Sequence, residues 1–180
     1  FSLDSKFTQE TGTIYLTGIQ ALLRVMLDQK RADRRDGLDT AGLVCGYPGS
    51  PVGGVDFEMQ RYKPLLSKNN IEHIAGLNEE LAATALFGTQ LLHEVPGRKH
   101  DGVFGMWFGK SPGVDRAADA FHHANFHGVG ANGGVLAVAG DDPHARSTIL
   151  PSDSNTIFSS FYMPVLAPAN IQEELDFGLH

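Results

Sequence analysis

Two adjacent carboxylates, Glu79 and Glu80, stand where proton chemistry is possible. They follow Asn78, a favoured helix N-cap, and so fall in the first turn of a predicted helix, where acidic side chains interact well with the helix dipole. That arrangement alone would explain both residues. The helix over 81–88 carries almost no charge and is expected to be buried, so a carboxyl group at its mouth loses hydration and suits proton exchange. The residues leave both roles open.

A glycine-rich segment precedes this pair. Residues 46–54 hold four glycines and two prolines, which allows backbone N–H groups around Gly49 to approach an anionic or polar ligand closely. Ser50 is the only hydroxyl of the segment apart from Tyr47. The segment matches neither the Walker pattern nor the dinucleotide fingerprint, and many such strand-to-helix turns are turns only. A ligand role and a plain turn both stay open.

Two cationic side chains are candidates for an anion contact. Lys110 follows an apolar run that ends in Trp107 and Phe108, and Arg116 lies in the helix that begins soon afterwards. A lysine that is simply solvated is the more common situation. Asp141 and Asp142 follow a later apolar run and have the ligand type of a hard-cation site, although paired acidic residues at a strand end are usually turn formers and caps.

His123 and His127 lie four residues apart in one predicted helix, with His122 alongside. This spacing occurs in metal sites, and a metal hydrolase is the weakest of the functional hypotheses. The helix lacks the acidic partner of a zinc enzyme. Surface or packing histidines are therefore the favoured interpretation.

The segments that must position these side chains alternate between two patterns. Short apolar runs at 41–45, 71–77, 102–108, 134–139 and 163–166 are typical of buried strands. Helical patterns occupy 55–66, 79–92, 114–126 and 155–161, after a first amphipathic helix with apolar residues from Leu16 to Met26 and a solvated basic end. The alternation predicts an α/β fold with a doubly wound, mostly parallel sheet of about five to six strands and helices on both faces. Ligands of such sheets bind at the carboxyl ends of the strands, where the polar segments above are found.

Composition narrows the function classes. The 180 residues carry a formal charge of −7 and a single cysteine, Cys45, which excludes an internal disulfide framework, a thiolate zinc site and a self-contained iron–sulfur cluster. The acidic total argues against nucleic-acid binding, and no apolar run approaches the length of a membrane span. We expect a cytoplasmic protein and one domain over 1–180, with its core over about 12–178, cut from a longer chain.

Four motifs, taken in order, resemble a known family. They are Gly46 to Pro51, Leu77 to Ala85, Gly109 to Arg116 and Gly140 to Pro143. Together they are similar to the pyrimidine-binding domain of thiamine-diphosphate-dependent 2-oxoacid:ferredoxin oxidoreductases, nearest the large fused indolepyruvate ferredoxin oxidoreductases. The likeness covers roughly residues 12–178, and its specificity comes from the order of the motifs at successive strand ends.

The resemblance implies an enzyme that oxidatively decarboxylates an aryl or other 2-oxoacid with coenzyme A and reduces ferredoxin. Glu79 matches the family's catalytic glutamate, which hydrogen-bonds the aminopyrimidine ring of thiamine diphosphate and favours the imino form that takes the thiazolium C2 proton. Gly49 and Ser50 match the cofactor-contacting loop, and Ser50, Lys110 and Arg116 are candidate substrate contacts. Glu80 is then a neighbour and not the catalyst.

The family pattern also implies what other domains must supply. The Gly-Asp-Gly motif that holds the diphosphate and its magnesium does not occur here, and the cysteines of the iron–sulfur clusters are missing. We therefore expect a diphosphate-binding domain of the same or another protomer as partner, a homo-oligomer, and no activity of this domain alone. The alternative from a different class is a non-catalytic α/β module that binds a ligand or serves subunit assembly.

Overall fold

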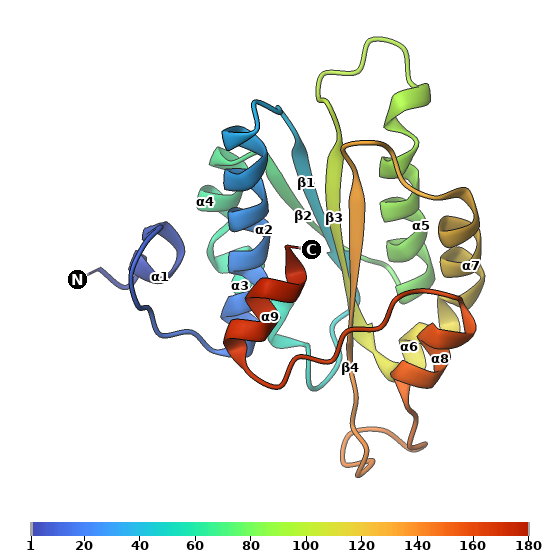
Figure 1. The fold of residues 1–180 in the computed structure, drawn as a ribbon. Helices are drawn as coiled ribbons and strands as arrows, with labels where there is room; N and C mark the ends of the chain where they lie inside the picture. Colours follow the sequence, from blue (N-terminus) through green and yellow to red (C-terminus); the bar gives the residue numbers. More distant parts are fainter. Residues whose placement is uncertain (1, 180) are drawn as a thin grey trace.

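The computed structural model describes residues 2–179. Within them, four parallel strands form one sheet in the order β2-β1-β3-β4, with bounds β1 (Ala41–Gly46), β2 (Ile71–Ala75), β3 (Val103–Lys110) and β4 (Gly134–Gly140). Figure 1 shows helices on both faces of this sheet. The predicted α/β class with a parallel sheet is confirmed, whereas the predicted number of five to six strands is too high for the described residues.

The helices divide between the two faces. One face is covered by α2 (Gly18–Arg35), α3 (Gly54–Arg61), α4 (Lys63–Lys68) and α9 (Ile171–Gly178), and the other by α5 (Glu79–Gln90), α6 (Ser111–Arg116), α7 (Ala118–His127) and α8 (Ser154–Ser160). The short α1 (Ser5–Thr8) lies outside α2, and a single 3₁₀ turn, η1 (Leu92–Glu94), follows α5. In residues 2–179 no helix is long and apolar enough to cross a membrane.

Each face of the sheet has its own apolar core. The α2 side buries Phe7, Leu23, Val44, Met59 and Met106, and the α5 side buries Cys45, Trp107, Phe121, Phe158 and Phe161. Cys45 of β1 lies opposite Ile74 of β2 and Trp107 of β3. Neighbouring strand residues alternate between the two cores because side chains of a strand point to opposite faces, and this explains why the central strands are continuous apolar runs.

Some predicted elements differ from the observed ones. Residues 163–166 form no strand, because Pro164 and Pro168 lack the N–H donors that a sheet needs. The predicted helix 55–66 is two helices that meet at Tyr62, and the predicted helix 114–126 is divided at Ala117 between α6 and α7.

The basic end of α2 is only partly solvated, which corrects the expectation for this helix. Lys30 is 1% exposed. Its ammonium donates to the carbonyl oxygen of Thr40 and lies 3.3 Å from a carboxylate oxygen of Asp39. The lysine therefore ties α2 to the start of β1, whereas Arg34 and Arg35 in the last turn are exposed.

Candidate active site

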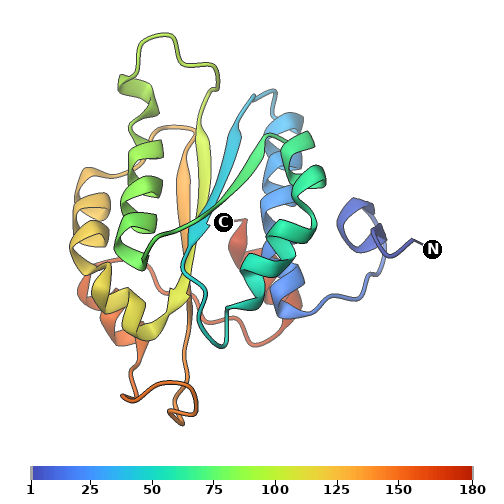
Figure 2. The ribbon, with the colours of Figure 1, turned by 180° about the vertical axis from the view of Figure 1, so that it is seen from behind.

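The loops that leave the four strands meet at one edge of the sheet, the lower edge in Figures 1 and 2. The Gly76 N–H donates to the Gly46 carbonyl (N···O 2.9 Å), which joins the loops after β2 and β1. A Cβ placed on Gly49 would lie 3.3 Å from the Cβ of Lys110, so the glycine-rich loop also abuts the end of β3. Because parallel sheets bind ligands at this edge, the candidate site lies here.

Glu79 is held at the mouth of α5. Its side chain is only 15% exposed. The Asn78 side chain caps the helix by accepting from the Leu81 N–H (2.8 Å), as the sequence predicted. From the sheet side, the fully buried Trp107 donates its indole N–H to the Glu79 carbonyl oxygen (3.0 Å). These two hydrogen bonds hold the backbone of the first turn of α5, from which the Glu79 side chain extends.

The wall behind the Glu79 carboxyl group comes from α6. A Cβ on Gly113 would lie 2.5 Å from Cγ and 2.9 Å from Oε1 of Glu79, so only glycine leaves room for this side chain. The Arg116 Nε lies 4.0 Å from Glu79 Oε2, and the Arg116 side chain is 60% exposed, which makes this a weak ion pair. Arg116 is thus free to exchange this contact for another anion.

The glycine-rich loop presents Ser50 to solvent beside this site. Ser50 is exposed, Gly49 is half-buried, and the Ser50–Pro51 peptide bond is cis. A Cβ on Gly140 would lie 2.9 Å from the Pro51 ring, so the loop packs against the end of β4. Glu80, unlike Glu79, is exposed.

Lys110 contacts the loop that follows β4. Its ammonium donates to the carbonyl oxygen (2.6 Å) and the hydroxyl (2.8 Å) of Ser147, and lies 3.9 Å from Asp142 Oδ2. Hydrogen bonds from Ser147 hold the pKa of the Asp142 carboxyl below its usual range. The structure thus places Lys110 beside Ser147 and Arg116 beside Glu79, at two separate points of the edge. A contact of either cation with a substrate stays a prediction.

A buried pair near the site was missed by the sequence analysis. The Nε2 atom of His73 on β2 lies 3.3 Å from Asp56 Oδ1 in the first turn of α3, and their side chains are 4% and 13% exposed. The two atoms do not have the orientation of a hydrogen bond. Burial lowers the pKa of His73, Asp56 opposes this shift, and Lys63 adds to it. Because the two residues are 17 positions apart in separate elements, no local pattern could have predicted the pair.

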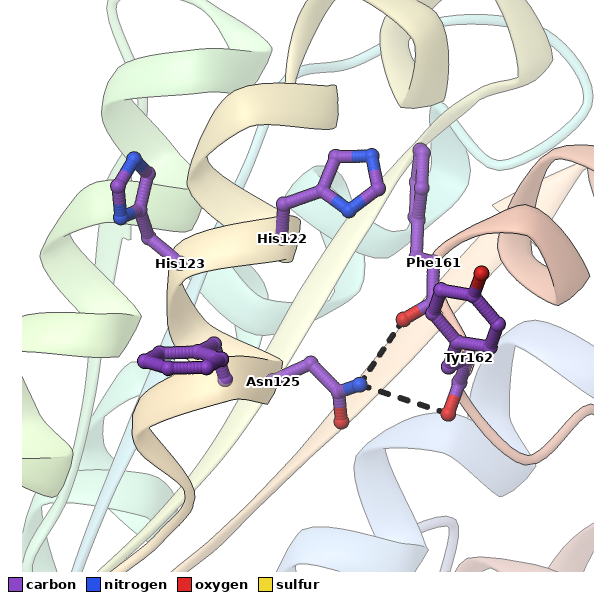
Figure 3. Close-up of a pocket in the computed structure, with 6 residues that line it drawn as sticks. His122, His123, Asn125, Phe161 and Tyr162 are labelled. Carbon is purple, nitrogen blue, oxygen red and sulfur yellow. Dashed lines mark hydrogen bonds between the residues drawn. The ribbon is translucent and has the colours of Figure 1, made fainter.

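The histidines of α7 are not assembled into a metal site. His123 Nε2 lies 3.6 Å from Asp119, and His127 Nε2 lies 3.6 Å from Glu94. Figure 3 shows His122 turned toward Phe161, while His123 points away from it. Both histidines line a hollow of about 360 Å³ between α7 and the turn after α8. Across residues 2–179 no group of three or more His, Cys, Asp or Glu side chains could hold a metal ion.

These observations define a class of protein: a parallel α/β domain whose candidate site combines a shielded carboxyl group with a glycine-rich loop at the carboxyl edge of the sheet. No family model matches the sequence. The chain is similar to indolepyruvate oxidoreductase subunit IorA of Pyrococcus abyssi, with 29% identity over 154 residues that cover 85% of this chain and 22% of that protein.

Proteins of the same name from two other organisms are similar to this chain to a comparable degree. The identity is 27% over 163 residues for Pyrococcus horikoshii, covering 91% of this chain and 22% of that protein. For Methanothermobacter marburgensis the identity is 25% over 167 residues, covering 93% of this chain and 23% of that protein. These relatives confirm the sequence resemblance to indolepyruvate oxidoreductases. The chain spans less than a quarter of the length of each of these curated relatives.

Proposed function

We propose that this chain is the pyrimidine-binding part of a thiamine-diphosphate-dependent 2-oxoacid:ferredoxin oxidoreductase, and that Glu79 is its catalytic residue. The observation that carries the proposal is the shielded carboxyl group of Glu79, on a helix turn whose backbone Trp107 holds, at the carboxyl edge of the sheet. The names of the relatives support an indolepyruvate or other arylpyruvate substrate. Coenzyme A as second substrate, ferredoxin as electron acceptor and a cytoplasmic location belong to the same proposal.

The surroundings of Glu79 support a role of its carboxyl group toward an aminopyrimidine ring. Gly113 leaves room for the Glu79 side chain, which an added Cβ atom would displace, and the Trp107 indole donates to the backbone of the first turn of α5. A carboxyl group held in this way can hydrogen-bond a ring nitrogen and hold or release a proton there. When bound, thiamine diphosphate would supply a nucleophilic thiazolium carbon and a ring that serves as electron sink for decarboxylation.

The remaining candidate residues have supporting roles in the proposal. Gly49 lets the backbone of the glycine-rich loop approach the cofactor closely, and the exposed Ser50 hydroxyl contacts cofactor or substrate. Arg116, whose pairing with Glu79 is weak, meets the substrate carboxylate. Lys110 is a second candidate for an anion contact, although it would first have to exchange its hydrogen bonds to Ser147.

Other parts of the enzyme must complete the site. We infer that the diphosphate, its magnesium ion and the iron–sulfur clusters are held by further domains of the same or another protomer in a homo-oligomer. The lone cysteine of this chain is buried, and burial raises the pKa of its thiol, so Cys45 is poorly suited to ligate a metal. The isolated domain is accordingly expected to be inactive.

The alternative of a non-catalytic module would gain support from a solvent-facing Glu79, and the side chain is only 15% exposed. The decisive test replaces Glu79 with glutamine in the full-length protein and measures acceptor reduction driven by indolepyruvate. We expect turnover to fall by about 10²-fold or more with cofactor content preserved. Glu80→Gln, at the exposed neighbour, is the matched control and should leave turnover unchanged. Near-normal turnover of Glu79→Gln would refute the assignment.

A further inference from the structure

The loop between β4 and α8 is anchored to the site by an internal polar cluster. Asp142 accepts hydrogen bonds from the N–H (2.6 Å) and hydroxyl (2.9 Å) of Ser147 and from the N–H of Arg146 (3.2 Å). Lys110, at the end of β3, donates to the carbonyl oxygen and hydroxyl of the same serine. Ser147 is therefore bound through its N–H, carbonyl and hydroxyl groups. In Figure 1 this loop forms the projection below the sheet.

The two charged members of the cluster are shielded and balance each other. The side chains of Lys110 and Asp142 are 14% and 13% exposed, and their charged atoms lie 3.9 Å apart. An ammonium group has three donors, of which two are used by Ser147 and the third has Asp142 as its nearest carboxylate. A substrate anion at Lys110 would have to displace hydrogen bonds of 2.6 and 2.8 Å. The geometry therefore favours a structural role for Lys110.

We propose that Lys110 is a positioning residue that, with Asp142 and Ser147, forms a latch holding the 142–151 loop at the rim of the Glu79 site. This inference rests on the proposed function for its catalytic consequence only. Lys110 directly precedes α6, whose Gly113 backs Glu79, and a Cβ placed on Gly49 of the glycine-rich loop would lie 3.3 Å from the Lys110 Cβ. Opening the latch would thus loosen the start of α6, which backs the catalytic carboxyl group, without changing that group.

A second set of hydrogen bonds holds the C-terminal end of the loop. The Ser152 hydroxyl donates to that of Ser111 (2.6 Å), and the Ser154 N–H donates to Asp141 (3.1 Å). Between the anchors, Ile149 and Leu150 are 96% and 71% exposed. The loop thus leaves two apolar side chains exposed between its two anchors.

A trypsin cleavage site within the loop can report how often the loop opens. Arg146 is exposed within it, so trypsin cleavage after Arg146 in the full-length protein measures how often the loop opens. We expect Ser147→Ala, Asp142→Asn and Lys110→Met each to speed this cleavage about fivefold or more, and Lys110→Arg to restore most of the protection. In the Lys110→Met and Asp142→Asn double variant the effects should be clearly less than multiplicative. Cleavage after Arg98, in a loop at the opposite edge of the sheet, is the internal control.

Steady-state kinetics then separate the latch from a direct anion contact. If the latch is real, Ser147→Ala and Lys110→Met both raise KM for indolepyruvate severalfold, with a smaller effect on kcat. The proposal is overturned if Lys110→Met alone raises KM while Ser147→Ala changes neither KM nor the cleavage rate. Failure of the proposed function is a distinct result, since Glu79→Gln would then retain turnover while the cleavage assay still reports on the latch.

Discussion

Replacing Gly113 with alanine is expected to displace the Glu79 carboxyl group without unfolding the sheet. The new methyl carbon would lie 2.5 Å from Glu79 Cγ, whereas carbon atoms in contact are about 3.5 to 4.0 Å apart. The glutamate side chain must therefore retreat by about 1 Å. Because a misplacement of that size in an active site costs about 10²-fold in rate, we expect kcat to fall by about that factor.

The assay compares two glycine variants in the full-length protein by indolepyruvate-dependent acceptor reduction and by thermal unfolding. Gly88 lies in α5, the helix that carries Glu79, and a Cβ there would meet nothing within 4 Å. Gly88→Ala should keep full turnover and gain up to about 1 kcal/mol in stability. Full turnover of Gly113→Ala would refute the prediction, because the position of Glu79 would then not limit the reaction. Loss of the folded state would also refute it, because the substitution would then act on packing and not on the position of Glu79 alone.

Two further predictions concern the surroundings of Glu79. Trp107→Phe removes the hydrogen bond to the Glu79 carbonyl oxygen; it should cost about 1 kcal/mol in the free energy of unfolding and lower turnover, and unchanged urea unfolding and kinetics would contradict it. His73, whose pKa is lowered from 6.5, binds a proton more readily in the unfolded state. The stability linked to it is therefore present above about pH 6.5 and falls as the pH drops toward the folded value. Between pH 7.5 and 5.5 the His73→Gln variant should lose less in Tm than the parent, and equal losses would contradict this.

The sequence predicted those parts of the fold that depend on local patterns. The strands β1 to β4 lie within two residues of the predicted runs. For the central strands β1 and β3 the reason is that strands covered on both faces are continuous apolar segments. The start of α5 at Glu79 was predicted because Asn78 is a local capping signal. The run at 163–166 was misread because its apolar residues outweighed Pro164, which prevents sheet pairing.

The sequence predicted which candidate residues lie at this edge of the sheet, but it did not predict their contacts. Strand-end positions indicated Glu79, Ser50, Lys110 and Arg116 because parallel strands end at the same edge. The partner of Lys110 is 37 residues away along the chain, and the glycine that accommodates Glu79 lies in α6. Such pairings are set by the packing of loops on the folded sheet, which no spacing in the sequence encodes.

The central claim is that the Glu79 carboxyl group activates bound thiamine diphosphate. The most direct test is the rate of hydrogen–deuterium exchange at the thiazolium C2 of the cofactor in the full-length protein, with glutamate or glutamine at position 79. We predict a fall of about 10²-fold or more in Glu79→Gln at equal cofactor occupancy, and no change in Glu80→Gln. Equal exchange rates in the parent protein and Glu79→Gln would contradict the account.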